Sequence, residues 1–203
     1  MGVSIKRFII FTLWAIIYLK THFGVLRNPY FIILVENNQL LLNILFIVII
    51  LISYYRDILA SIKNIKLKTI CIYSLIPAII LLFGNLLLLF LIFDSLVLES
   101  FSFSILFIIN SLVIGPIYEE FIYRFIFINN NWQVKVKLAA VILSSLIFTF
   151  SHGVSVDGNI AMLVQFLMLG IGLGIIYIRT NNIFYCICTH FFYNSFVLLM
   201  SLV

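Results

Sequence analysis

The chain has 203 residues, of which 65% are hydrophobic and only 9% are charged. A mean hydropathy of +1.27 excludes an ordinary soluble domain, in which about 25% of residues are charged. The formal net charge of +5 does not indicate nucleic-acid binding, because the 12 basic residues are spread among long apolar runs and form no patch. We therefore expect an all-α, polytopic membrane protein.

Seven apolar segments come close to the length of about 20 residues that a helix needs to cross a bilayer. The first is the weakest, because Lys20 and His22 fall within it, and we expect His22 to lie at the membrane interface. Residues 1–203 are thus predicted to form a single integral membrane domain of about seven transmembrane helices. The segments run over Phe8–Leu26, Leu40–Tyr55, Ile70–Phe93, Phe103–Ile128, Leu138–His152, Ile160–Ile178 and Ile183–Val203.

The polar links between these segments alternate in charge. Basic links stay on the cytoplasmic side of a membrane, which predicts a cytoplasmic N-terminus and a C-terminus on the other side. The link with Arg27 and Glu36 is discordant and leaves open a re-entrant or interfacial segment near residues 20–38. The alternation is carried by Lys6 and Arg7, Arg56 to Lys68, Lys135 and Lys137, and Arg179 on one side, and by Asp94, Glu99 and Asp157 on the other.

Two carboxylates and a guanidinium interrupt the fourth segment at Glu119, Glu120 and Arg124. A charge at bilayer depth costs at least about 2.5 to 3.5 kcal/mol, so such residues usually face the bundle interior and serve a function. Glu120 and Arg124 are four residues apart and can pair on one helix face, while Glu119 lies about 100° around the helix and can point elsewhere. Gly115-Pro116 precede them, and we expect a kink there that widens a cavity, the alternative being a tolerated membrane proline.

Further polar residues fall in the fifth and seventh segments, at His152, His190 and Asn194. Helical rise from the predicted cytoplasmic ends puts them and Glu119 in one layer, about 12 to 22 Å into the membrane. A carboxylate can take a proton from water, imidazoles can polarise a carbonyl or hold a metal, and an amide can donate to an oxyanion. These residues therefore predict a hydrolytic site, although each histidine alone could be a simple helix contact.

Small residues recur in the sixth segment, at Gly170 and Gly174. Their spacing of four residues predicts close packing against a neighbouring membrane helix and no phosphate loop.

Three motifs follow one another on these apolar segments, and their order resembles that of the CAAX protease and bacteriocin-processing family (CPBP, or Abi), which includes the type 2 CAAX prenyl endopeptidases. The resemblance covers about residues 100–203, and residues 1–99 would then be N-terminal scaffold helices. The motifs are Glu119-Glu120-x-x-x-Arg124, Phe148-x-x-x-His152 and His190-x-x-x-Asn194.

The resemblance implies an intramembrane endopeptidase that hydrolyses a peptide bond of a membrane-associated peptide or protein. It implies that Glu119 activates the attacking water with His152 as its partner, and that His190 and Asn194 line an oxyanion hole. Glu120 and Arg124 would support these groups. Bacterial relatives also imply a location in the cell membrane of a bacterium.

Members of this family have been described both as metalloproteases and as metal-independent glutamate proteases. If a metal is present, zinc held by Glu119, His152 and His190 is the alternative, but Glu119 could not then remain the base. We favour a metal-free site with no cofactor. The expected partners are the peptide or membrane-protein substrate and the lipid bilayer, with no nucleic acid.

Two other functions stay open at this point. The same fold could serve as a non-catalytic bacteriocin self-immunity or regulatory protein, which would not need Glu119. A proton-coupled transporter or channel could also use buried Glu, His and Arg, although the sequence lacks the inverted repeats typical of many transporters.

Overall fold

A computed structural model describes residues 3–22, 38–63, 65–93, 104–152 and 159–202 of the chain, and these residues form helices and short links without any strand. Within these ranges, six helices are long and apolar enough to cross a membrane. The prediction of an all-α, polytopic membrane bundle is confirmed.

The helices follow the predicted segments closely. Two of the rods combine α-helical and π-helical (η) turns, namely α4 to α5 and α6 to η3. In chain order the elements are α1 (Val3–His22), α3 (Gln39–Lys63), α4 (Leu67–Ile70), η1 (Cys71–Leu75), α5 (Ile76–Phe93), α6 (Ile105–Ile109), η2 (Asn110–Ile114), α7 (Gly115–Glu120), η3 (Phe121–Ile126), α8 (Val134–His152), α9 (Ile160–Thr180) and α10 (Ile183–Met200).

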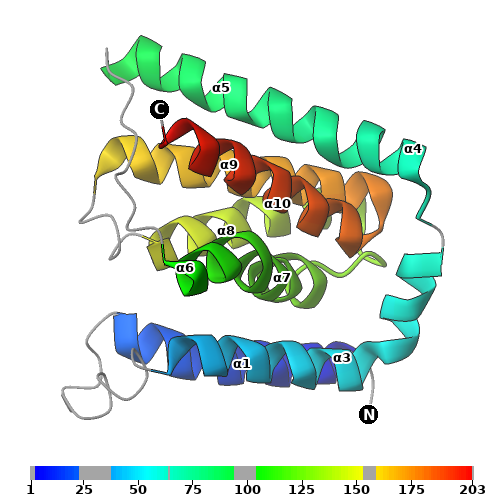
Figure 1. The fold of residues 1–203 in the computed structure, drawn as a ribbon. Coiled ribbons are helices and arrows are strands. Elements are labelled where there is room, and N and C mark those ends of the chain that lie inside the picture. Colours follow the sequence, from blue (N-terminus) through cyan, green and yellow to red (C-terminus); the bar gives the residue numbers. More distant parts are fainter. Residues whose placement is uncertain (1–2, 23–37, 64, 94–103, 153–158, 203) are drawn as a thin grey trace.

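Helices α6 to α10 form the middle of the bundle, with α5 along one side and α1 beside α3 along the other (Figure 1). The chain crosses from the α1 and α3 side to the α5 side through a bend in α3, where Tyr54 leaves helical geometry at φ −129° and ψ 24°. The middle of the bundle therefore contains the segments that carry the three motifs, while α1 and α3 add residues such as Trp14, Phe46 and Ile50 to the hydrophobic core.

The first predicted segment forms α1, but α1 is not among the six helices that meet the length and hydropathy expected of a span. The reason is its charge, because Lys6 and Arg7 lie near its start and Lys20 near its end. The side chains of Lys20 and His22 lie outside the described residues, as do Arg27, Glu36 and the proposed extra segment near residues 23–37.

Basic residues gather at one end of the bundle. Figure 1 shows the end of α3, the starts of α4, α8 and α10, and the end of α9 at the same end as the N-terminus. This arrangement is the one that the alternating links predict, whereas Asp94, Glu99 and Asp157 lie outside the described residues. We refer below to this end as the basic end; its described basic residues are Lys6, Arg7, Arg56, Lys63, Lys66, Lys68, Lys135, Lys137 and Arg179.

The expected kink at Gly115-Pro116 takes another form, because the chain stays helical from Ile105 to Ile126. The departure from α geometry lies in two π-helical turns, η2 before Gly115 and η3 after Glu120. Such turns widen the helix locally, and they commonly occur beside prolines and functional residues. Gly115 is needed here, because a Cβ would lie 2.9 Å from the carbonyl oxygen of Asn110.

Helix α9 packs tightly on α8 through its small residues. A Cβ added at Gly170 would lie 3.0 Å from Cβ of Ser145, and one at Gly174 would lie 2.6 Å from Cγ1 of Val141. The predicted close helix packing at Gly170 and Gly174 is therefore confirmed, and it fixes the position of His152 on α8 relative to α9.

Candidate active site

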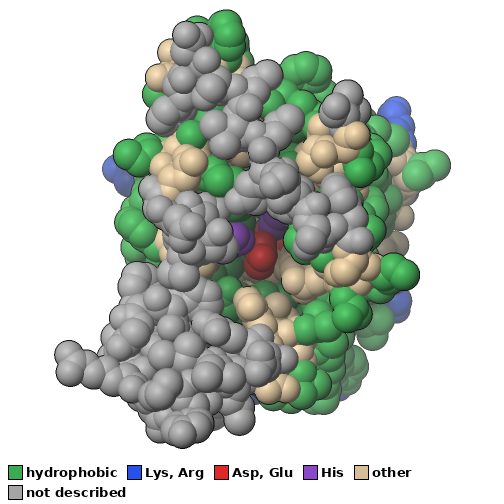
Figure 2. Space-filling model, turned by 60° about the vertical axis from the view of Figure 1, so that its left-hand side comes forward, with side chains coloured by type: hydrophobic (Ala, Val, Ile, Leu, Met, Phe, Trp, Pro, Cys, Tyr) green, Lys and Arg blue, Asp and Glu red, His purple; other side chains and the backbone are tan. Residues whose placement is uncertain are grey.

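A cavity of about 300 Å³ lies among α5, the α6 to α7 rod, α8, α9 and α10. Its rim includes Phe107 near the start of α6, Met162 near the start of α9 and Met200 at the end of α10, so it opens at the end opposite to the basic end. Figure 2 looks toward that end and shows acidic and histidine side chains at the bottom of a hollow. The polar lining residues are Asn85, Asn110, Ser111, Glu119, His152, Gln165, His190, Tyr193 and Asn194.

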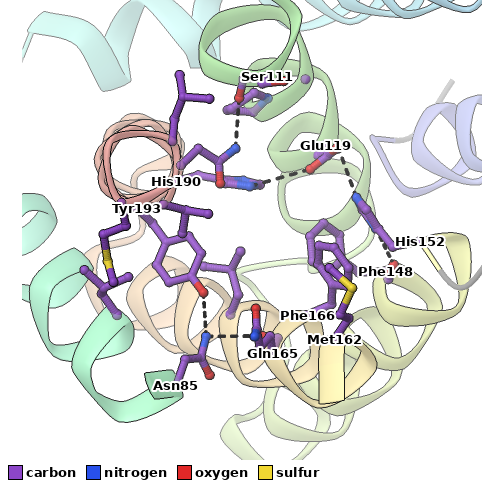
Figure 3. Close-up of a pocket in the computed structure, with 18 of the residues that line it drawn as sticks. Asn85, Ser111, Glu119, Phe148, His152, Met162, Gln165, Phe166, His190 and Tyr193 are labelled. Carbon is purple, nitrogen blue, oxygen red and sulfur yellow. Dashed lines mark hydrogen bonds and ion pairs between the residues drawn. The ribbon is translucent and has the colours of Figure 1, made fainter. Parts of the chain in front are cut away.

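The Glu119 carboxylate lies between two histidines at the cavity wall (Figure 3). Its Oε1 is 3.7 Å from Nε2 of His152, and its Oε2 is 3.7 Å from Nε2 of His190. The Glu119 side chain keeps 20% of its surface exposed. The three residues that the sequence placed at one depth are thus brought together around one cavity.

Contacts on the side away from Glu119 fix the orientation of the His152 ring. Nδ1 donates to the carbonyl oxygen of Phe148 at 2.8 Å, and because a carbonyl only accepts, the hydrogen is on Nδ1. The ring also stacks on Phe166 with centroids 4.3 Å apart and contacts Phe148 at 4.5 Å. Nε2 is therefore the nitrogen that faces Glu119. The bond from Nδ1 to Phe148 is possible because the two residues are four positions apart and lie on the same face of α8.

His190 bridges the two adjacent carboxylates. Its Nδ1 donates to Oε1 of Glu120 at 2.9 Å, while Nε2 faces Glu119. The side chain is 3% exposed. Glu120 thus occupies Nδ1 and leaves Nε2 as the ring nitrogen that faces the cavity.

Glu120 and Arg124 form the predicted i, i+4 ion pair, with Nη1 of Arg124 3.2 Å from Oε1 of Glu120 and both side chains fully buried. Nη2 of Arg124 also donates to the carbonyl oxygen of Gly170 at 3.1 Å. The guanidinium lies 5.0 Å from the ring centroid of Phe148. The pair therefore joins the first motif to α8 and α9, behind the cavity.

Asn194 lines the same cavity one turn after His190. Its Nδ2 donates one hydrogen to the carbonyl oxygen of Ser111 at 2.9 Å, which ties α10 to η2. An amide nitrogen carries two hydrogens, and no partner among the described residues takes the second.

The sequence did not single out five polar residues of this cavity, namely Asn85, Asn110, Ser111, Gln165 and Tyr193. Asn85 lies in α5, a helix that was expected to be scaffold and that lines the cavity. A signal was present, because Asn85 and Gln165 are isolated amides in otherwise apolar stretches, which is unusual for residues that face lipid. The division of the chain at about residue 100 stays a prediction.

No three His, Cys, Asp or Glu side chains of the described residues converge closely enough to hold a metal ion. The alternative that Glu119, His152 and His190 hold zinc stays a prediction.

Comparison with known proteins agrees with the three motifs. Residues 101–196 match the family model described as "Type II CAAX prenyl endopeptidase Rce1-like". A protein of Bacillus subtilis (strain 168) named "Putative membrane peptidase YdiL" is 32% identical over 97 residues, which are 48% of this chain and only 38% of that relative. No solved structure matches the chain significantly. Residues 101–196, which contain all seven motif positions, are thus similar in sequence to the type II CAAX prenyl endopeptidase (CPBP) family.

Proposed function

We propose that the chain is an intramembrane endopeptidase that uses a glutamate-activated water to hydrolyse a peptide bond. One observation carries the proposal: both oxygens of Glu119 face an imidazole Nε2 at 3.7 Å on the wall of a cavity of about 300 Å³. The family-level similarity to membrane proteases supports the same class of reaction.

The spacing around Glu119 suits a water molecule. A separation of 3.7 Å is too long for a direct hydrogen bond, and groups at this distance are commonly bridged by water. Such a water would donate one hydrogen to Oε1 of Glu119 and the other to the lone pair on Nε2 of His152. Its oxygen lone pair would remain free to attack a carbonyl carbon.

The reaction needs one proton to move twice. Glu119 takes a proton from the water as the new carbon–oxygen bond forms, and it returns that proton to the leaving nitrogen as the carbon–nitrogen bond breaks. The products are a carboxylic acid and an amine. A carboxylate fixed at the cavity wall can perform both transfers without any other co-reactant.

The oxyanion of the intermediate needs donors in a fixed position. The second hydrogen on Nδ2 of Asn194 is one candidate, and Nε2 of His190 is the other when both ring nitrogens carry hydrogen. Glu120 holds His190 at Nδ1, and Ser111 holds Asn194 through its carbonyl oxygen. Both donors are thus positioned before a substrate enters, which reduces the cost of reorganisation.

The proposal is tested by incubating the purified, detergent-solubilised protein with a library of internally quenched apolar peptides. We expect cleavage by the native protein and by the control Asp57→Asn, which removes an exposed carboxylate beside the basic end. Glu119→Gln and His152→Ala should lower kcat by at least about a hundredfold, the low end of what a general base contributes. Full activity in both variants would overturn the assignment.

A further inference from the structure

A second polar group lies across the cavity from Glu119 (Figure 3). It joins Asn85 of α5, Gln165 of α9 and Tyr193 of α10. Nδ2 of Asn85 donates to the Tyr193 hydroxyl at 2.7 Å and to the backbone carbonyl oxygen of Gln165 at 3.4 Å. Asn85 is 2% exposed and Tyr193 is 6% exposed. The catalytic proposal makes no use of this group.

The hydrogen bonds fix what the group offers to an occupant. Because the carbonyl of Gln165 only accepts, the atom of Asn85 that faces it is the nitrogen. The same nitrogen donates to Tyr193, so the hydroxyl accepts and keeps its own hydrogen. Among the described residues, no acceptor takes that hydrogen and no partner pairs with the side-chain amide of Gln165. Polar groups in such a place usually have partners, which an occupant of the cavity can supply.

A peptide group matches these unused positions. It carries one acceptor and one donor, and both need partners in an apolar cavity. The Tyr193 hydroxyl supplies a donor, and the Gln165 amide supplies an acceptor. Around them the wall is apolar, with Leu86, Met162 and Phe166 among its residues.

The position along α10 sets the register. Tyr193 follows His190 by three residues, which is about 4.5 Å of helical rise. An extended peptide rises about 3.3 Å per residue. For a peptide that runs along α10, the peptide group at Tyr193 is therefore one or two residues away from a bond that lies at Glu119 and His190.

We propose that Tyr193 and Gln165 form a substrate-binding subsite that holds one backbone peptide group of an extended apolar peptide, with Asn85 orienting Tyr193. This inference rests on the proposed function of the site. A helical substrate already pairs its backbone groups internally and gains nothing here. The subsite therefore selects segments that are extended or unwound over intact transmembrane helices.

The test uses a leucine- and alanine-rich, internally quenched peptide and analogues in which one peptide bond at a time is an ester. An ester lacks the N–H donor and has a weaker acceptor. In the native protein, the ester at one position beside the scissile bond should raise KM about three- to tenfold, the effect of one neutral hydrogen bond. Tyr193→Phe should raise KM for the all-amide peptide by a similar factor. In this variant, the same ester should raise KM by a smaller factor than in the native protein.

The matched control is Tyr185→Phe on the same helix, whose hydroxyl donates to Thr69 at 2.8 Å toward the basic end. It should keep the native KM and the native ester effect. If the Tyr193 hydroxyl only connected helices, Tyr193→Phe would lower the melting temperature. Its effect on KM would then not depend on which peptide bond is replaced by an ester. A native KM in Tyr193→Phe, or an ester effect of unchanged size, overturns the subsite.

A separate arm distinguishes this proposal from the catalytic one. If the native protein cleaves no peptide, the endopeptidase assignment fails, and binding of a fluorescein-labelled version of the same peptide decides about the subsite. Binding that is weakened by Tyr193→Phe but not by Tyr185→Phe supports a peptide-binding site without catalysis. Equal binding by both variants, or no binding at all, overturns the inference.

Discussion

Glu119 and Glu120 are adjacent in the chain, yet the fold gives their carboxylates different surroundings. Glu120 is fully buried between Arg124 and His190, whereas Glu119 is 20% exposed at the cavity. The rotation of about 100° between neighbouring helix positions separates them. Glu119 is thus available to a ligand, while Glu120 holds its neighbours in place.

Replacing Glu120 by glutamine tests this structural role. Glu120→Gln keeps the size of the side chain but leaves the buried Arg124 without a counter-charge and His190 without its carboxylate. Loss of one partner of a buried ion pair costs about 3 to 5 kcal/mol, so we expect a clearly lower melting temperature and reduced peptidase activity. A melting curve and an activity that equal those of the native protein would contradict this role.

Removal of metal ions should leave the activity in place. The described residues offer no cluster of three metal-binding side chains, and Glu119 is proposed as the base instead of a ligand. We expect the peptidase activity to survive dialysis against a chelator and to gain nothing from added zinc. Activity that disappears with the chelator and returns with zinc would show that Glu119, His152 and His190 rearrange around a metal.

Among the helices, the contact between α8 and α9 depends on glycines that admit no side chain. Gly174 faces Val141, and Gly170 faces Ser145 while its carbonyl accepts from Arg124. Gly170 thus takes part both in the close α8–α9 contact and in the hydrogen bond that holds the buried Arg124, so the burial of Arg124 depends on the distance between the two helices.

A pair of matched substitutions measures how tight this contact is. Gly174→Ala would force its Cβ to within 2.6 Å of Val141, whereas a Cβ at Gly84 on α5 meets nothing within 4 Å. Overpacking costs about 1 to 3 kcal/mol, so Gly174→Ala should lower the melting temperature in detergent. Gly84→Ala should leave it equal or slightly higher, because alanine favours helix. Equal melting temperatures for the two variants would show that α8 and α9 can move apart at no cost to accommodate the added methyl group.

How far the sequence predicts these elements depends on the range of the interactions involved. The ion pair of Glu120 and Arg124 and the packing glycines follow from spacing within one helix, and both are confirmed. Pro116 has no N–H, so a carbonyl of the preceding turn loses its usual helical partner. The π-helical turns near Pro116 depend on which other group such a carbonyl contacts, and residue spacing in the sequence does not reveal this. The bridging of both carboxylates by His190 depends on the rotation of α10 against α7. Only the folded bundle defines that rotation.

For the whole molecule, hydropathy predicts the bundle well because a bilayer demands long apolar helices. The six candidate spans follow the predicted segments, and α1 differs because basic residues occur near both of its ends. Hydropathy cannot say which helices surround a cavity. Asn85 therefore emerges as a cavity residue only when α5 is packed against α9 and α10.

The orientation of the bundle in the membrane is a prediction for labelling. Under the positive-inside rule the basic end faces the cytoplasm. In a protein with Cys71 and Cys188 replaced by serine, a membrane-impermeant maleimide added to intact cells should label Leu202→Cys but not Lys66→Cys. Both should react after the cells are permeabilised. Labelling of Lys66→Cys in intact cells would mean that the bundle has the opposite orientation.

The opening of the cavity away from the basic end has a consequence for pharmacology. If the basic end is cytoplasmic, the carboxylate of Glu119 is reached from the outer side of the membrane. A charged inhibitor that cannot cross lipid would then reach Glu119 from that side without having to pass through the bilayer.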